Sequence, residues 1–190
     1  MPLFDHFDVI APIYDRVIGF RQPEAILKTA DLPVDGRILD AGGGTGRVSG
    51  TLVGKASHII VADLSFKMLK EASLKDGLQT VQSHSEALPF PNNCFERVIM
   101  VDALHHVCNQ GDTAVELWRV LKPGGRIVIE EPDVRTLAVK FIAIAEKIAL
   151  MRSHFLYPVE IEKLFPFPEA VTTVSKEGNT AWVVIEKSSD

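Results

Sequence analysis

The chain has 190 residues, of which 46% are hydrophobic and 24% are charged, and its formal net charge is -5. This length suffices for one α/β core and is short for two, so we expect a single domain over residues 1–190. A net negative charge lacks the positive field on which non-specific binding to nucleic-acid phosphates relies. We therefore expect no nucleic-acid partner.

Three features favour a cytoplasmic protein. The cysteines Cys94 and Cys108 form neither a disulfide framework nor a CxxC metal pair, which fits a reducing compartment. The first residues carry acidic side chains where a signal peptide would carry basic ones. The apolar stretch over residues 134–151 contains charged side chains, so we expect a helix packed on a sheet and no stable membrane insertion, with an interfacial membrane helix as the alternative.

Apolar runs alternate with segments of helical periodicity, which is the pattern of helices covering a largely parallel sheet. In chain order we predict a helix over Gln22–Ala30, a strand over Arg37–Ala41, a helix over Gly46–Val53, a strand over His58–Asp63, a helix over Phe66–Lys75, strands over Thr80–Gln82 and Glu96–Val101, a helix over Thr113–Leu121, a strand over Arg126–Glu130, a helix over Val134–Met151, and strands over Ala170–Ser175 and Thr180–Glu186.

Two breaks in this alternation define the fold class. The segment Lys122–Gly125 ends a helix, because its proline and two glycines cannot continue one. The turn Glu177–Asn179 is so short that the last two strands must form an antiparallel hairpin. We therefore predict an α/β, Rossmann-like, doubly wound and mostly parallel seven-stranded sheet with a C-terminal antiparallel hairpin.

A glycine-rich loop, Gly42–Gly46, follows the first predicted strand. Glycine reaches backbone angles closed to other residues and lets the main chain approach a ligand at the carboxyl end of the sheet. The dinucleotide pattern GxGxxG would need a glycine at Arg47, so the loop matches GxGxG instead. A nicotinamide-dependent oxidoreductase is therefore the weaker hypothesis, and the predicted terminal hairpin also disfavours it.

The acidic residues beside this loop indicate the charge of its ligand. A dinucleotide places a pyrophosphate at the helix N-terminus, whereas S-adenosylmethionine has no phosphate and carries an amino group and a sulfonium. The carboxylate of Asp40 would attract that amino group and repel a pyrophosphate, although it could instead cap the turn. Asp63 lies about 20 residues beyond the loop, where an acidic residue accepts hydrogen bonds from ribose hydroxyls. Leu64 and Met68 either face a purine or belong to the core.

Further motifs follow in order: Ser85–Pro91 (SEALPFP), Ala103–Val107 (ALHHV) and Leu121–Gly125 (LKPGG). With them, residues 4–131 resemble class I S-adenosylmethionine-dependent methyltransferases, in which a terminal antiparallel hairpin is characteristic. Residues Phe7–Asp15 (FDVIAPIYD) are similar to the N-terminal signature of the ubiquinone and menaquinone C-methyltransferase branch, methyltransferase type 11.

The resemblance implies an S-adenosylmethionine-dependent methyltransferase with a substrate-side segment over residues 1–35, a cofactor-binding core over 36–131, and a long helix and hairpin over 132–190. His84 departs from the family, which usually has aspartate there to accept from the adenine amino group, and Asp102 stands where a small or apolar residue is usual. The expected cofactor-binding residues are Asp40, Gly42, Gly43, Gly44, Thr45, Gly46, Asp63, Leu64, Met68, His84, Ser85, Glu86 and Val101.

Methyl transfer from a sulfonium is a direct displacement, so alignment is the main task of the protein. A general base is needed only when the acceptor must lose a proton. His105, His106 and Asp102 follow the fourth strand and are the candidates for such a base, with a structural or cofactor-shaping role of the histidine pair as the alternative. We expect no metal, because the spacing of histidine and cysteine matches no ligand pattern.

The methyl acceptor is expected to be a small, apolar or aromatic molecule, with a quinone precursor as the leading hypothesis. Its predicted contacts are Tyr14, His106, Phe155 and Tyr157, and the neighbouring Phe165 and Phe167 either line the same pocket or pack in the core. The short region before the hairpin leaves the site open, which a homodimer would close. The alternative function is a non-catalytic methyltransferase-like module that binds the cofactor or a partner protein.

Overall fold

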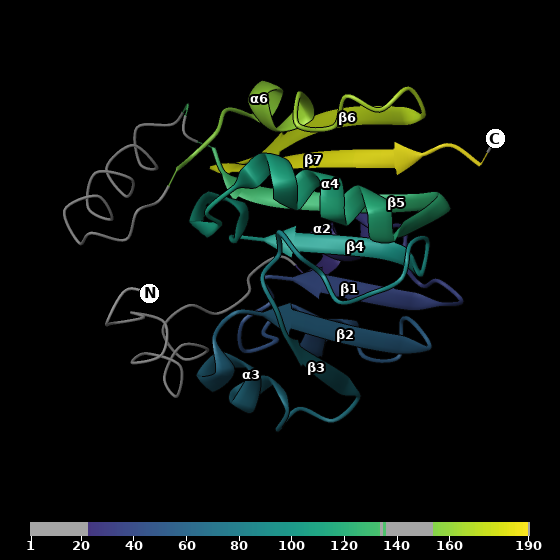
Figure 1. The fold of residues 1–190 in the computed structure, drawn as a ribbon, viewed down its shortest axis with the longest axis vertical. Coiled ribbons are helices and arrows are strands. Elements are labelled where there is room, and N and C mark those ends of the chain that lie inside the picture. The colour runs from purple at the N-terminus through teal and green to yellow at the C-terminus, as the bar shows by residue number, and fades with distance from the viewer. Residues whose placement is uncertain (1–22, 134, 136–153, 190) are drawn as a thin grey trace.

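The computed structural model describes residues 23–133, 135 and 154–189 (Figure 1). These residues form a seven-stranded sheet in the order β3-β2-β1-β4-β5-β7-β6. Its strands are β1 (Arg37–Ala41), β2 (His58–Asp63), β3 (Leu78–Gln82), β4 (Phe95–Val101), β5 (Leu121–Pro132), β6 (Ala170–Glu177) and β7 (Thr180–Lys187).

The pairing of these strands confirms the predicted fold class. The strands from β3 to β5 pair in parallel, whereas β7 pairs antiparallel with both β5 and β6. The chain runs outward from β1 to β3 and then returns to place β4 on the other side of β1. This reversal makes the carboxyl ends of β1 and β4 a topological switch point, where open α/β sheets bind ligands.

Four α-helices and two 3₁₀ helices are described. They are α2 (Pro23–Thr29), α3 (Phe66–Ala72), α4 (Gln110–Val120), α6 (Pro158–Glu162), η1 (Ser49–Leu52) and η2 (Leu104–His106). The predicted helix over residues 134–151 lies outside the described residues, apart from residue 135. Within the part of the chain that the structure describes, no helix is long and apolar enough to cross a membrane.

The predicted α-helix over Gly46–Val53 is wrong, because the segment contains only the single 3₁₀ turn η1. Its glycines, Gly46 and Gly50, are poor helix formers. Gly46 also adopts φ +68°, a left-handed angle that an α-helix excludes. The side chain of Ser49 donates to Asp40 Oδ2 at 2.7 Å, so this residue helps to hold the carboxyl group of Asp40 beneath the glycine loop.

Side chains alternate between the two faces of the sheet and build a core on each. Leu39 of β1 belongs to the cluster that contains Trp118 of α4. Its neighbour Ile38 belongs to the cluster on the other face, together with Ile26 of α2 and Trp182 of β7. Figure 1 shows α4 in front of the sheet and α2 behind it. Each helix therefore covers one apolar face, as the doubly wound fold requires.

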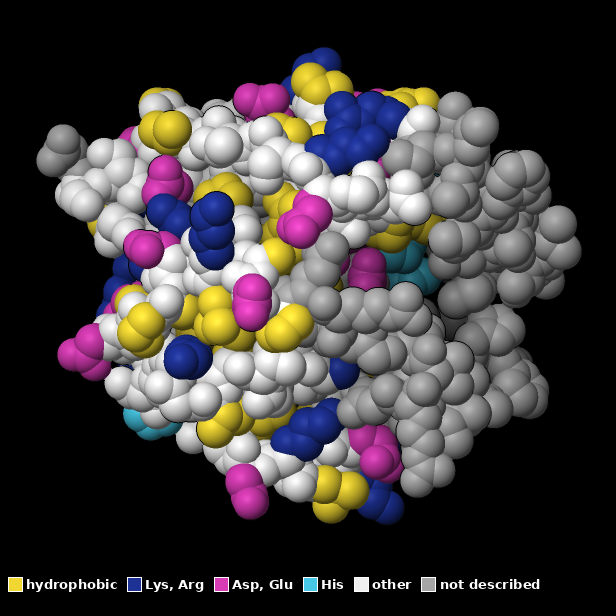
Figure 2. Space-filling model, turned by 180° about the vertical axis from the view of Figure 1, so that it is seen from behind, with side chains coloured by type: hydrophobic (Ala, Val, Ile, Leu, Met, Phe, Trp, Pro, Cys, Tyr) yellow, Lys and Arg dark blue, Asp and Glu magenta, His cyan; other side chains and the backbone are white. Residues whose placement is uncertain are grey.

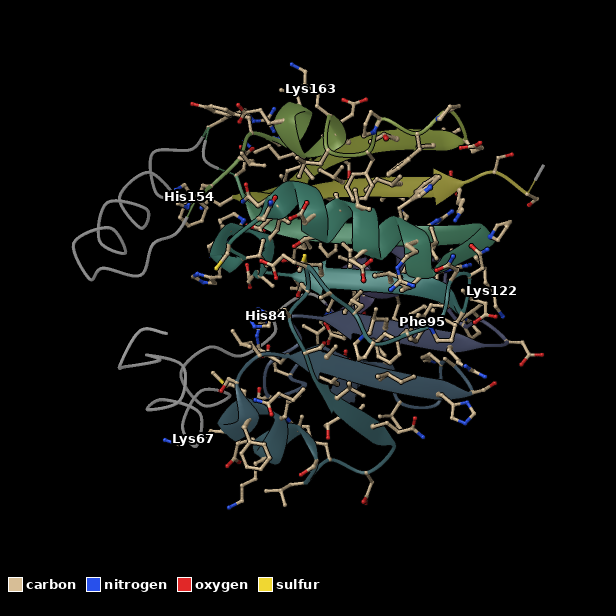
Figure 3. The ribbon with its side chains drawn as sticks, viewed as in Figure 1. Lys67, His84, Phe95, Lys122, His154 and Lys163 are labelled. Carbon is tan, nitrogen blue, oxygen red and sulfur yellow. The ribbon has the colours of Figure 1, made fainter. Side chains whose placement is uncertain are left out.

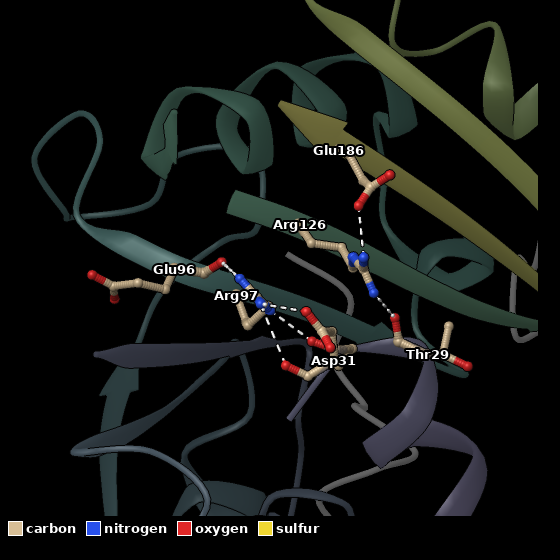
Figure 4. Close-up of polar contacts among 7 residues, drawn as sticks. Thr29, Asp31, Glu96, Arg97, Arg126 and Glu186 are labelled. Atoms are coloured by element: carbon tan, nitrogen blue, oxygen red, sulfur yellow. Dashed lines mark hydrogen bonds and ion pairs between the residues drawn. The ribbon is translucent and has the colours of Figure 1, made fainter. Parts of the chain in front are cut away.

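Two arginines fasten α2 to the sheet (Figure 4). Arg97 Nε donates to the Ala30 carbonyl at 2.6 Å, and Arg126 Nη1 donates to the Thr29 carbonyl at 2.9 Å. The last carbonyls of a helix have no partner within the helix and carry its partial negative charge, which a guanidinium satisfies. Arg126 also pairs with Glu186 of β7 at 2.6 Å.

The LKPGG segment ends α4 as predicted, but β5 begins earlier than expected, at Leu121. Phe95 pairs with Leu121 and Arg97 with Arg126, so the residues between them on β5 bulge out of the ladder. Lys122 in this bulge pairs with Glu96.

Two aromatic residues before the hairpin, Phe165 and Phe167, pack in the core. Phe165 is 4% exposed, and the ring of Phe167 stacks on Trp118 with centroids 4.6 Å apart. Of the two interpretations of this segment, core packing holds for these two residues.

Candidate functional site

The loops that follow β1, β2, β4 and β5 meet at one edge of the sheet, because the carboxyl ends of parallel strands lie together. Figure 3 shows His84 and His154 at this edge, and Phe95 and Lys122 at the opposite edge. The predicted cofactor loop follows β1, Asp63 is the last residue of β2, and Asp102 and the histidine pair follow β4.

The glycines of the loop differ in how closely other described residues pack against them. Gly42, Gly44 and Gly46 have φ angles of +70°, +55° and +68°. A Cβ atom on Gly42 would lie 2.7 Å from the Ala103 side chain, and one on Gly46 would lie 2.7 Å from Leu78, so these two glycines permit close packing. Among the described residues, the nearest atom to a Cβ on Gly44 would be Asp63 Oδ2, at 3.9 Å. A ligand could therefore approach the main chain at Gly44.

The carboxylate of Asp63 is fixed beside that position. Its Oδ2 accepts from Gly44 N at 2.9 Å, and its Oδ1 accepts from Ser65 N at 2.8 Å. These two backbone donors orient the carboxylate. The arrangement holds an oriented acceptor beside the open backbone of the loop, as ribose hydroxyls require.

Asp40 lies beneath the loop and is 1% exposed. Burial raises its pKa to about 6, and the hydrogen bond from Ser49 opposes that rise. A Cβ on Gly43 would lie 2.5 Å from Asp40 Cγ, so the chain crosses directly over this carboxyl group. The group is ionised at neutral pH and gives the loop a negative charge, which suits a cationic ligand.

The other predicted cofactor residues differ in exposure. Leu64 is 52% exposed and Met68 is 2% exposed, so the core interpretation holds for Met68. Thr45 is buried, and its carbonyl accepts from Lys75 Nζ at 2.5 Å. Val101 is buried at the end of β4.

Glu86 joins the predicted adenine-side segment to the loop after β4. Its Oε1 accepts from Cys108 N at 2.9 Å and from Asn109 N at 3.1 Å. His84 is exposed, with Nδ1 3.9 Å from Glu86 Oε2, and Ser85 between them is partly buried.

A buried glutamate, Glu131, holds the loop that carries the histidine pair. Its Oε1 accepts from Ala103 N at 3.1 Å and from Leu104 N at 2.8 Å, while Oε2 lies 2.5 Å from His105 Nδ1. His105 is 4% exposed. This geometry engages one ring nitrogen of His105 and favours a positioning role over base catalysis.

Burial, followed by the neighbouring His105, lowers the pKa of His106 to about 3. The imidazole is therefore neutral at physiological pH and is a weak proton acceptor. The rings of His105 and His106 lie 3.9 Å apart, and Phe155 stacks on His105 at 4.3 Å. Tyr157 is 47% exposed. The predicted substrate residue Tyr14 lies outside the described residues.

An ion pair connects the cofactor loop to the loop after β4. Arg47 Nη2 lies 2.6 Å from Asp102 Oδ2, and Arg47 is almost buried. Asp102 adopts φ +51°, an unusual angle for a residue other than glycine. The residue that breaks the dinucleotide pattern thus bridges the two sides of the switch point.

Glu130 is a buried carboxyl group that sequence reasoning missed, as it missed Glu131. Two adjacent glutamates at the end of an apolar strand were the available signal. Glu130 is 7% exposed, and burial, followed by the charge of Asp102, raises its pKa to about 8. Among the described side chains, no group of three or more potential ligands could hold a metal ion.

Known proteins with similar sequences are methyltransferases. A family model described as a methyltransferase domain matches residues 39–129. The ubiquinone/menaquinone biosynthesis C-methyltransferase of Coxiella burnetii is 39% identical over 113 residues, which are 54% of this chain and 45% of that protein. Its counterpart in Pectobacterium carotovorum is 30% identical over 156 residues, which are 71% of this chain and 62% of that protein. The chain therefore spans about half the length of these relatives.

A solved structure supports the fold over nearly the whole chain. The putative methyltransferase of Haloferax volcanii, solved in complex with an activator protein, superposes with a TM-score of 0.81 at 17% identity, covering 98% of this chain and 99% of that one. Residues 39–129 thus match a methyltransferase domain, and the fold is that of solved methyltransferases. Among methyltransferases, the chain resembles the ubiquinone and menaquinone C-methyltransferase branch.

The loop held by Glu131 should depend strongly on that side chain. Replacing Glu131 with alanine leaves buried donors at Ala103, Leu104 and His105, so we expect the free energy of unfolding to fall by at least about 3 kcal/mol. Glu186→Ala removes a half-exposed ion-pair partner and should cost less than about 1 kcal/mol. Urea denaturation measures both changes, and equal losses would contradict this role of Glu131.

Glu130 should make stability fall with rising pH. Its folded pKa of about 8 exceeds the ordinary value of 4.5, so unfolding releases a proton between these pH values. Between these pH values, this proton lowers the free energy of unfolding by up to about 1.4 kcal/mol for each unit that the pH rises. Glu130→Gln removes it, so the variant should gain stability relative to the wild type as pH rises from about 5 to 8. Parallel pH profiles from thermal denaturation would contradict the prediction, and Glu186→Gln is the control expected to give parallel profiles.

Proposed function

We propose that this chain binds S-adenosylmethionine at the carboxyl edge of the sheet and transfers its methyl group to a small molecule. The observation that carries the proposal is the open backbone at Gly44 with the Asp63 carboxylate fixed beside it. The methyltransferase domain match over residues 39–129 supports it, as do the activities for which the relatives are named.

The residues present fit the cofactor group by group. Asp63 would accept hydrogen bonds from the ribose hydroxyls, since its carboxylate is already oriented by two backbone donors. The buried charge of Asp40 would attract the amino group of the methionine part through the loop above it. Leu64, which is half exposed next to Asp63, would cover one side of the purine.

The bound cofactor supplies an activated methyl group on a sulfonium. The chain's own contribution is then to align the acceptor and to exclude water. Glu131 fixes residues 103–105, and the Arg47–Asp102 ion pair fixes the start of that loop against the glycine loop. The low pKa of His106 and the engaged nitrogen of His105 favour alignment by this loop over proton removal.

The acceptor in this proposal is small and apolar or aromatic, and a quinone precursor is the leading hypothesis. The names of the relatives from Coxiella burnetii and Pectobacterium carotovorum support it. Phe155, stacked on His105, provides an aromatic surface at the same edge. Acidic and basic side chains are interspersed on the face shown in Figure 2, which agrees with a small-molecule acceptor rather than nucleic acid. A homodimer remains part of the proposal as the means of closing the site.

Calorimetric titration with S-adenosylmethionine and S-adenosylhomocysteine tests the cofactor. We expect dissociation constants in the micromolar range, weakened at least about tenfold by Asp63→Ala, because the ribose loses its acceptor and Gly44 loses its partner. Asp76→Ala, an exposed carboxylate after α3, is the control that should leave binding unchanged. No binding by the wild type would overturn the proposal.

Transfer of a labelled methyl group to quinone precursors tests catalysis. Labelled product extracted into an organic solvent supports the enzyme. Cofactor binding without transfer to any apolar acceptor would favour the alternative, a non-catalytic module that binds the cofactor or a partner protein.

A further inference from the structure

Two buried polar atoms without a partner lie on neighbouring strands. Glu130 of β5 and Trp182 of β7 are directly opposed in the antiparallel register. Opposed residues of such a pair place their side chains on the same face. The two side chains are 7% and 2% exposed. Within the described part of the chain, neither Glu130 Oε2 nor Trp182 Nε1 has a hydrogen-bond partner.

The pair lies next to the proposed cofactor site. Trp182 packs with Val101 and Val128 on the face that α2 covers, and Glu130 follows Val128 by two residues on the same face. The Glu130 carbonyl accepts from Asp102 N at 3.0 Å. Asp102 in turn pairs with Arg47 of the glycine loop. The two unsatisfied atoms are thus connected through Asp102 to the loop that would hold the cofactor.

The hydrogen-bonding capacity of the two atoms indicates which chemical group of a ligand could bind both. An indole nitrogen can only donate a hydrogen bond, and a carboxyl oxygen can accept one. A hydroxyl group accepts and donates at the same atom, so it satisfies both. The charged groups that act on Glu130 are the carboxylates of Asp102, Glu131 and Glu177 and the guanidinium of Arg47. Three negative charges against one positive charge disfavour an anionic ligand and favour a neutral one.

Unsatisfied buried polar groups are rare in native proteins, and a ligand is one of the few partners that can explain them. We propose that Glu130 Oε2 and Trp182 Nε1 bind a hydroxyl group on an otherwise apolar methyl acceptor. The apolar part of the acceptor would lie against the valines beside the pair. This inference rests on the proposed function, because it concerns the molecule that receives the methyl group.

The indole N–H signals in a heteronuclear NMR spectrum report on this site directly. The chain has two tryptophans, Trp118 and Trp182, so the spectrum contains two such signals, and Trp182→Phe assigns them. Trp118 lies in the core on the opposite face and is an internal control. The probes are para-propylphenol, which carries a hydroxyl, and para-propylanisole, which has the same ring and no hydroxyl proton. Each is added with and without saturating S-adenosylhomocysteine.

We expect para-propylphenol to shift the Trp182 signal in a saturable manner and to leave the Trp118 signal in place. Para-propylanisole should bind at least about tenfold more weakly. Equal responses to the two probes, no response of Trp182, or equal shifts of both tryptophans would overturn the proposal.

Glu130→Met supplies a second measurement. The variant removes a buried carboxyl whose Oε2 has no partner among the described residues, so we expect its melting temperature without ligand to equal or exceed that of the wild type, while the phenol affinity falls at least about tenfold. A lower melting temperature with unchanged phenol affinity would assign Glu130 a structural role instead. Binding of S-adenosylhomocysteine is measured in the same samples. Its absence counts against the proposed function, whereas its presence without a Trp182 response counts against this inference alone.

Discussion

The hydrogen bond from Gly44 N to the Asp63 carboxylate is the interaction on which the rest of the site depends. It joins the loop after β1 to the end of β2, at the edge where both parallel strands terminate. The bond orients the carboxylate and sets the course of the loop, so the acceptor and the open backbone lie side by side before any ligand arrives. Such preorganisation lowers the entropy that binding must overcome.

Hydrogen bonds from backbone N–H groups to a carboxylate also occur elsewhere around the switch point. Carboxylates at or near strand ends accept backbone N–H groups from a neighbouring loop, as Glu131 does for residues 103 and 104 and Glu86 does for residues 108 and 109. Loops that leave a sheet carry backbone donors without ladder partners, and a buried carboxylate satisfies several of them at once. The edge is therefore acidic, which suits a cationic cofactor. At Glu130, burial and then the charge of Asp102 raise the pKa.

Sequence reasoning predicted most of the fold, because apolar runs, glycine breaks and the short hairpin turn are local signals. The strands β1 and β2 have the predicted bounds. It failed over Gly46–Val53, where the left-handed Gly46 excludes a continuous α-helix. It left the role of Met68 open because a motif does not specify burial. It also missed Glu130 and Arg47. Their roles arise from strand pairing between residues distant in the sequence, which no local pattern records.

A crystal structure of the protein with S-adenosylhomocysteine would show directly whether Asp63 and Gly44 form the cofactor site. We expect the ligand over the glycine loop, with both ribose hydroxyls within hydrogen-bonding distance of the Asp63 carboxylate and the main chain of Gly44 in contact with the ligand. Density for the ligand away from the carboxyl ends of β1 and β2, or an Asp63 side chain turned away from the ribose, would contradict this assignment of the site.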